Sequence, residues 1–145
     1  MRDNTDDVSE AGTYEPLPEK QYQFKIKEAS EVVSKAGNPL FKAVFEVVND
    51  PNYSGRLVFE QFSWFPKGHK SRNVNGICKH FLHVIGEAYE GDIEILPQRW
   101  MNKRFVGVIE HQADKQTGKI YSKIGEYVLP EDVTPQENNN EDVPF

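Results

Sequence analysis

Apolar and polar residues alternate at the start of the central region of the chain. Tyr22, Phe24 and Ile26 alternate with polar neighbours in a run over 21–33, and this period of two predicts a strand with one buried face. The turn-forming residues of SKAGNP separate this run from 40–48, which is rich in aromatic and β-branched residues. We therefore expect a second strand that follows the first through a hairpin.

A third strand and a helix are predicted next. Residues 56–64 (RLVFEQFSW) have the composition of a strand, with apolar side chains on both faces. Further on, Ser71 is a suitable N-cap for a helix and Gly86 a suitable end. Apolar residues recur between these two positions at helical spacing, at Val74, Ile77, Cys78, Phe81, Leu82 and Ile85.

A final hairpin completes the pattern. The runs 103–110 and 120–129 flank the sequence ADKQTG, whose Asp114 and Gly118 favour a turn. The predicted order β-β-β-α-β-β is that of the OB-fold, a small barrel that binds oligonucleotides or oligosaccharides through one face and two loops. We therefore expect a mainly β, five-stranded OB-fold barrel, with an SH3-like barrel or an α+β meander as the alternatives.

Charge is segregated along the chain, which has a net charge of −6. Residues 1–19 hold six acids and one base, and residues 131–145 hold five acids and no base, so each segment carries −5. Residues 20–130 hold 16 bases and 12 acids, a net charge of +4. We expect an acidic flexible segment at 1–19, a nucleic-acid-binding domain at 20–130 and a disordered acidic tail at 131–145.

Composition predicts a cytoplasmic protein. No run approaches the roughly 18 apolar residues of a membrane span, and the acidic opening MRDNTDDVSE is unlike a signal peptide. Cys78 is the single cysteine of the chain, which excludes an internal disulfide and fits a reducing compartment.

The central region interleaves the two kinds of side chain that a groove for single-stranded nucleic acid needs. Cations follow the phosphates, and flat aromatic faces stack on unpaired bases. We expect the rings of Phe24, Phe45, Phe81 and Phe105 to fill the core instead. The residues expected to contact DNA are Lys25, Lys27, Lys42, Arg56, Phe59, Phe62, Trp64, Lys67, Lys70, Arg72, Trp100, Lys103, Arg104, Lys119, Tyr121 and Lys123.

The run CKHFLH suggests a metal site, but helical geometry argues against one. Cys78 belongs to the apolar stripe, whereas His80 and His83 point roughly the other way, so the thiol and the imidazoles diverge. The same divergence argues against a catalytic Cys-His pair. No carboxylate pair or glycine-rich phosphate loop stands out, so we expect no metal, no cofactor and no enzymatic activity.

The sequence NNNEDVPF places two acids and an apolar tip at the end of a polar segment. An exposed phenyl ring gains nothing from folding unless something binds it. A protein partner could hold the tip with an apolar pocket for Phe145 and a basic rim for the acids. The residues expected to bind such a partner are Glu141, Asp142, Val143, Pro144 and Phe145.

This tip resembles the acidic tail of bacterial single-stranded DNA-binding proteins, which typically ends in several Asp followed by Ile-Pro-Phe. It departs from that pattern in having Val143 and only two adjacent acids. The central stretch KAGNPLFKAVFEVVNDPNYSGRLVFEQF, with KRFVGVIE and 119–127, is similar to small phage-encoded proteins regarded as single-stranded DNA binders. That resemblance covers roughly 16–130 in a loose pattern.

The resemblance implies a protein that binds single-stranded DNA without sequence preference during phage replication or recombination, in the cytoplasm of an infected bacterial cell. It also implies recruitment of replication, recombination and repair proteins through the tip, and no membrane partner. The alternatives are a mediator that acts mainly through protein binding and an RNA-binding OB module. Whether the chain forms a homo-oligomer is left open.

Overall fold

The computed structural model describes residues 15–133. Most of the predicted acidic segment at 1–19 and of the predicted tail at 131–145 falls outside this range, as does the whole predicted partner-binding tip from Glu141 to Phe145. The described part contains five strands, one α-helix and three short 3-10 helices.

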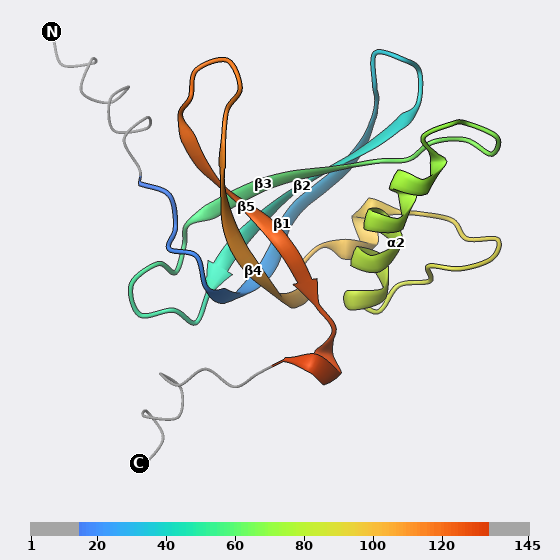
Figure 1. Cartoon of the computed structure of the whole chain (residues 1–145). Coiled ribbons are helices and arrows are strands. Elements are labelled where there is room, and N and C mark those ends of the chain that lie inside the picture. The colour runs from blue at the N-terminus through green and yellow to red at the C-terminus, as the bar shows by residue number, and fades with distance from the viewer. Residues whose placement is uncertain (1–14, 134–145) are drawn as a thin grey trace, which may run out of the picture.

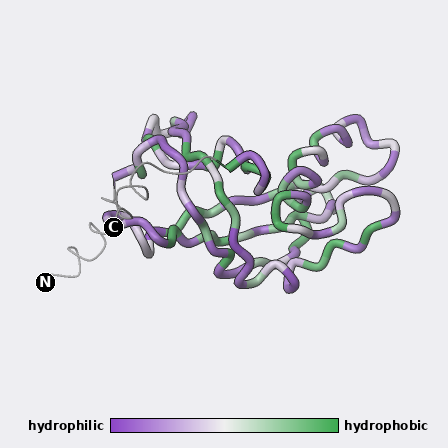
Figure 2. Tube along the Cα trace, turned by 90° about the horizontal axis from the view of Figure 1, so that it is seen from below, coloured by the Kyte–Doolittle hydropathy of each residue, from purple (hydrophilic) through white to green (hydrophobic). Residues whose placement is uncertain are grey.

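The five strands form one antiparallel sheet in the order β3-β2-β1-β4-β5 (Figure 1). Their bounds are Gln21–Val33 for β1, Pro39–Val48 for β2, Leu57–Ser63 for β3, Arg104–Ala113 for β4 and Ile120–Val128 for β5. The predicted mainly β class and the order β-β-β-α-β-β are confirmed, and each strand lies close to its predicted position. Hydrophobic and hydrophilic stretches are interspersed along the whole trace, as Figure 2 shows.

Helix α2 (Asn75–Val84) continues from the 3-10 helix η1 (Arg72–Val74). Ser71 stands before η1 as predicted, but its hydroxyl makes no capping hydrogen bond. The buried side of α2 is narrower than predicted, because the side chains of Val74 and Ile77 are exposed. The remaining 3-10 helices are η2 (Pro97–Trp100) and η3 (Pro130–Asp132).

Aromatic rings dominate the core between the curved sheet and α2. The four phenylalanines predicted to be core residues are all buried. Phe45 and Phe105 meet edge to face with ring centroids 4.8 Å apart, and Phe62 stacks on Phe81 at 4.7 Å. Burial of aromatic surface of this size is the main stabilising contribution that a small β domain has available.

Two bulges bend the sheet. An extra residue, Lys27, interrupts the pairing of β1 with β2, and Gly125 interrupts the pairing of β4 with β5. Bulges increase local twist, and the sheet curls so that its edge strands β3 and β5 approach each other. Within residues 15–133 these edges share no ladder, so the structure has an open five-stranded sheet and the predicted OB-fold barrel is not confirmed.

Candidate nucleic-acid interface

A cleft of about 690 Å³ lies between β1, β2 and β3 on one side and the β4–β5 hairpin on the other. Figure 1 shows the two arms that flank it: the β1–β2 hairpin and the β4–β5 hairpin rise on the same side of the molecule. The residues that line the cleft are Glu28, Ala29, Ser30, Lys42, Ala43, Val44, Phe59, Glu60, Gln61, Gln112, Tyr121 and Lys123.

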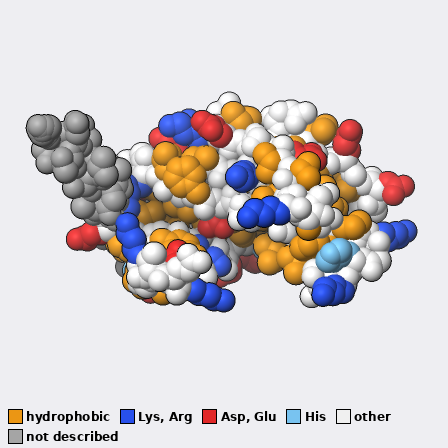
Figure 3. Space-filling model, turned by 90° about the horizontal axis from the view of Figure 1, so that it is seen from above, with side chains coloured by type: hydrophobic (Ala, Val, Ile, Leu, Met, Phe, Trp, Pro, Cys, Tyr) orange, Lys and Arg blue, Asp and Glu red, His pale blue; other side chains and the backbone are white. Residues whose placement is uncertain are grey.

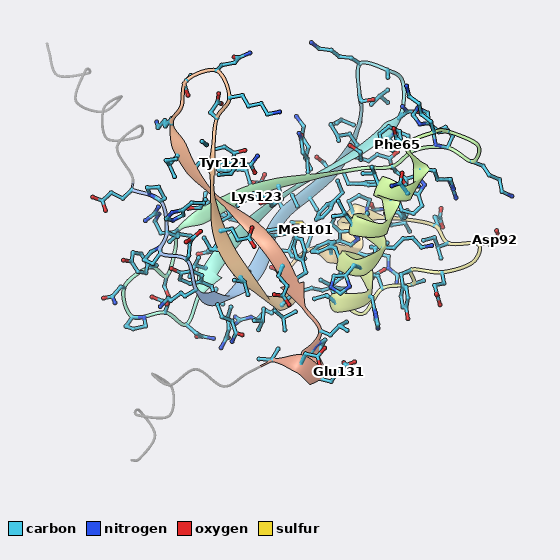
Figure 4. All side chains as sticks on the ribbon, viewed as in Figure 1. Phe65, Asp92, Met101, Tyr121, Lys123 and Glu131 are labelled. Carbon is cyan, nitrogen blue, oxygen red and sulfur yellow. The ribbon has the colours of Figure 1, made fainter. Side chains whose placement is uncertain are left out.

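Four of the predicted DNA-contacting residues meet in this cleft: Lys42 from β2, Phe59 from β3, and Tyr121 and Lys123 from β5. The side chain of Phe59 is 69% exposed and that of Tyr121 44% exposed. Figure 4 labels Tyr121 and Lys123 on β5, in the stretch where that strand passes β3. The cleft thus combines two accessible rings with two cations.

The cleft has a mixed electrostatic character. Burial raises the pKa of the Glu60 carboxyl, while the backbone amide of Ile124 and the charge of Lys123 lower it in part. The carboxylate of Glu28 also lines the cleft and offsets one of the two lysines. Figure 3 views this side of the molecule, where Lys and Arg side chains stand around a hollow that also holds acidic and hydrophobic side chains. The lysines can attract phosphates and the exposed rings can stack on bases, whereas the two glutamates of the lining oppose phosphate.

Two of the predicted contacts are wrong. The ring of Phe62 is 3% exposed and that of Trp100 is 0% exposed, so neither can offer a face to a base. Phe62 lies three residues after Phe59 on β3, and an odd spacing along a strand places side chains on opposite faces. Trp100 ends η2, where its ring packs 5.1 Å from Phe81 in the core.

The other predicted cations lie away from the cleft lining. Lys25 and Lys27 belong to β1, and Arg104 is the partner of Lys25 on β4. The exposed Lys67, Lys70 and Arg72 lie between β3 and α2, and Lys119 is at the tip of the β4–β5 hairpin. Several of these cations have protein partners. Lys103 pairs with Glu87 at 3.6 Å, and the guanidinium groups of Arg56 and Arg72 donate to the backbone oxygens of Glu15 at 2.6 Å and Phe65 at 2.7 Å.

Trp64 borders a second, smaller hollow of about 240 Å³. Its ring is half-buried beside the core. Arg72 also lines this hollow, together with Lys79 and Tyr89, two residues that the sequence did not single out. Their sequence signals are weak, because Lys79 lies on the polar side of a predicted helix and Tyr89 in a loop.

The groups of the CKHFLH run diverge in space. Cys78 is fully buried, and burial raises its pKa to about 12. His80 bonds through Nε2 to the backbone oxygen of Tyr127 at 2.7 Å, and His83 stacks on Tyr89. Among residues 15–133 no three His, Cys, Asp or Glu side chains gather closely enough to hold a metal ion.

Residues 3–137 match the model of the family described as Protein of unknown function (DUF669). A comparison with curated proteins finds no match. No helix in the described part of the chain is long and apolar enough to cross a membrane.

Proposed function

Since the chain belongs to this family of unknown function, we propose from the cleft itself that the protein binds single-stranded DNA without sequence preference, using an OB-type fold. The observation behind this proposal is the meeting of exposed Phe59 and Tyr121 with Lys42 and Lys123 between two hairpin arms. An OB-fold binds its ligands on the face of strands 2 and 3, between the loop that joins strands 1 and 2 and the loop that joins strands 4 and 5.

The strand order supports the OB interpretation. An OB-fold is a partly open barrel of five strands, and here β1 lies at the centre of the sheet, with β3 and β5 at its two edges. The edges are linked by a side chain: the Glu60 carboxylate accepts a hydrogen bond of 2.9 Å from the Ile124 amide. On this interpretation, the β1–β2 turn and the β4–β5 turn are the two binding loops.

The chemistry of the cleft favours unpaired strands over duplex. In duplex the base faces are covered by their neighbours, so exposed rings such as Phe59 and Tyr121 have nothing to stack on. A single strand offers a face at every base, and each stack contributes roughly 1–3 kcal/mol with little dependence on sequence. The two lysines add attraction to phosphate that does not depend on sequence either.

The resemblance to phage and bacterial single-stranded DNA-binding proteins also suggests a biological role for the proposed binding. The protein would coat single-stranded DNA during phage replication or recombination, and Glu141 to Phe145 would recruit replication, recombination or repair proteins. These five residues lie outside the described range, so this part of the proposal depends on their sequence alone.

The experiment that tests the proposal is fluorescence anisotropy of labelled oligo-dT with the wild-type protein and with Phe59→Ala and Tyr121→Ala variants. Each variant should weaken binding by about fivefold or more, the lower limit for one lost stack. Ile77→Ala, which removes an exposed apolar side chain from α2 outside the cleft, is the matched control and should bind like wild type. Equal affinity in all four proteins would contradict the proposed site, and competition by oligo-U as strong as by oligo-dT would favour an RNA-binding module.

A further inference from the structure

We propose that the hollow beside Trp64 is a second binding station for the same DNA strand, taking one unpaired base together with its phosphate. This inference depends on the proposed function, which concerns only the cleft between the hairpins. The hollow lies where the end of β3, the start of α2 and the loop after α2 come together.

Two aromatic side chains border the hollow, whose volume of about 240 Å³ is about a third of that of the main cleft. Trp64 follows β3 directly, and Tyr89 comes from the loop after α2. The Tyr89 ring is held parallel to His83, with centroids 4.2 Å apart and an interplanar angle of 16°. A base stacked on Trp64 would therefore meet an aromatic wall that is already fixed in place.

The charge of the hollow is more favourable to phosphate than that of the main cleft. Arg72 and Lys79 line it, and no acidic residue does. The first turn of α2 also lacks an acidic residue, so the positive end of the helix dipole is not neutralised there. Asp92 is on the same loop as Tyr89, but Figure 4 shows it at the outer bend of that loop.

Two residues that line the hollow, Asn75 and Arg72, are held in place by hydrogen bonds to the backbone of Phe65. The buried side chain of Asn75 accepts a hydrogen bond of 2.8 Å from the Phe65 amide and donates one of 3.0 Å to the Phe65 oxygen. The Arg72 guanidinium donates to the same oxygen at 2.7 Å, and the ring of Phe65 stacks on His69. A site that is formed before its ligand arrives loses less conformational entropy on binding.

Strand β3 connects the hollow to the main cleft. Phe59 and Gln61 line the cleft, and Trp64 lines the hollow five residues after Phe59. At about 3.3 Å per residue this separation is roughly 17 Å along the strand. Because this spacing is odd, Phe59 and Trp64 lie on opposite faces of β3. A single DNA strand would therefore pass around β3, which is an edge of the sheet, to reach both stations, and a short oligonucleotide would fill only one.

Tryptophan fluorescence provides a direct test in the full chain, because Trp64 and Trp100 are its two tryptophans and Trp100 is fully buried in the core. Oligo-dT of about twelve nucleotides, within the range of site sizes for one OB-fold, should quench the emission of Trp64. Anisotropy of the same labelled oligonucleotide measures binding independently. Binding without quenching would overturn the second station and leave the proposed function intact, whereas no binding at all would refute the proposed function.

A matched pair of lysine variants adds a second readout. Lys79→Gln removes a charge from the hollow, and Lys123→Gln removes one from the main cleft. For each protein we compare the affinity for oligo-dT of about twelve nucleotides with the affinity for oligo-dT of about four nucleotides. The ratio of the first to the second should be lower in Lys79→Gln than in wild type and should stay near the wild-type value in Lys123→Gln. Equal ratios in the two variants would overturn the second station.

Discussion

The carboxylate of Glu60 on β3 accepts a hydrogen bond of 2.9 Å from the backbone amide of Ile124 on β5. This contact joins the two edges of an open sheet beside the cleft that we propose for DNA, which Glu60 helps to line. Because the carboxyl is largely withdrawn from solvent, its pKa is raised. The same side chain thus affects both the shape of the site and its charge.

The first prediction concerns the pH dependence of stability. A raised pKa means that the folded state holds the Glu60 proton more tightly than the unfolded state does. Protonation of Glu60 therefore adds to the free energy of unfolding at low pH, and this stabilisation is lost as pH rises through the raised pKa. Glu60→Gln removes that dependence and keeps an acceptor for the Ile124 amide. Urea denaturation from about pH 4 to pH 7 should show that the free energy of unfolding of Glu60→Gln increases relative to that of wild type as pH rises. A constant difference between the two proteins would refute this prediction.

The second prediction separates core from surface on one strand. Phe62→Ala removes a ring that is 3% exposed and stacked on Phe81, and should lower the free energy of unfolding by about 3–5 kcal/mol. Phe59→Ala makes the same chemical change three residues earlier, at a ring that is 69% exposed, and should change it by less than about 0.5 kcal/mol. Urea denaturation of both variants measures the two values. Similar losses in both would mean that the assignment of the two faces is incorrect.

The third prediction concerns the connection between β3 and α2. Asn75→Ala removes both hydrogen bonds to the backbone of Phe65 and should destabilise the protein by about 1–3 kcal/mol. Asn73→Ala, at an exposed position of η1, is the control and should be close to neutral. Thermal denaturation followed by circular dichroism compares them, and an unchanged melting temperature in Asn75→Ala would show that the two bonds contribute nothing.

The fourth prediction concerns the proposed recruitment tip. Phe145→Ala keeps Glu141 and Asp142 but removes the ring that would fill a partner's apolar pocket. Affinity for oligo-dT should stay the same, while capture of bacterial replication, recombination or repair proteins should be lost. A variant that retains the same set of proteins as wild type would refute the recruitment proposal.

Local patterns were sufficient to predict most of the fold. The alternation in β1 is a signal from residues close together in sequence, and so are the turn residues Asp114 and Gly118. The structure has a strand at the first position and a hairpin at the second. The Asp114 carboxylate accepts hydrogen bonds from the amides of Gln116 and Thr117, as an Asx turn requires. The open edge between β3 and β5 could not be predicted, because it depends on how far two distant strands curl toward each other.

The proposed binding surface was harder to predict from sequence. Strand β3 has rings on both faces, so sequence alone could not decide whether Phe59 or Phe62 points outward. Trp100 is the last residue of the 3-10 helix η2, which begins at Pro97, and its burial arises from packing against Phe81, to which no local pattern points. The second hollow combines Trp64 with Tyr89 from a distant loop, a proximity that only the folded chain creates.

The central claim is that the cleft binds unpaired DNA by stacking and phosphate attraction. Titration of labelled oligo-dT and of a duplex of equal length, at about 50 and 200 mM salt, tests this most directly. We expect affinity for oligo-dT to exceed that for duplex and to fall up to about sevenfold over this range of salt, which is the counterion release expected for two phosphate contacts on a single strand. Equal affinity for the two DNAs, or no binding of oligo-dT at the lower salt concentration, would contradict the account.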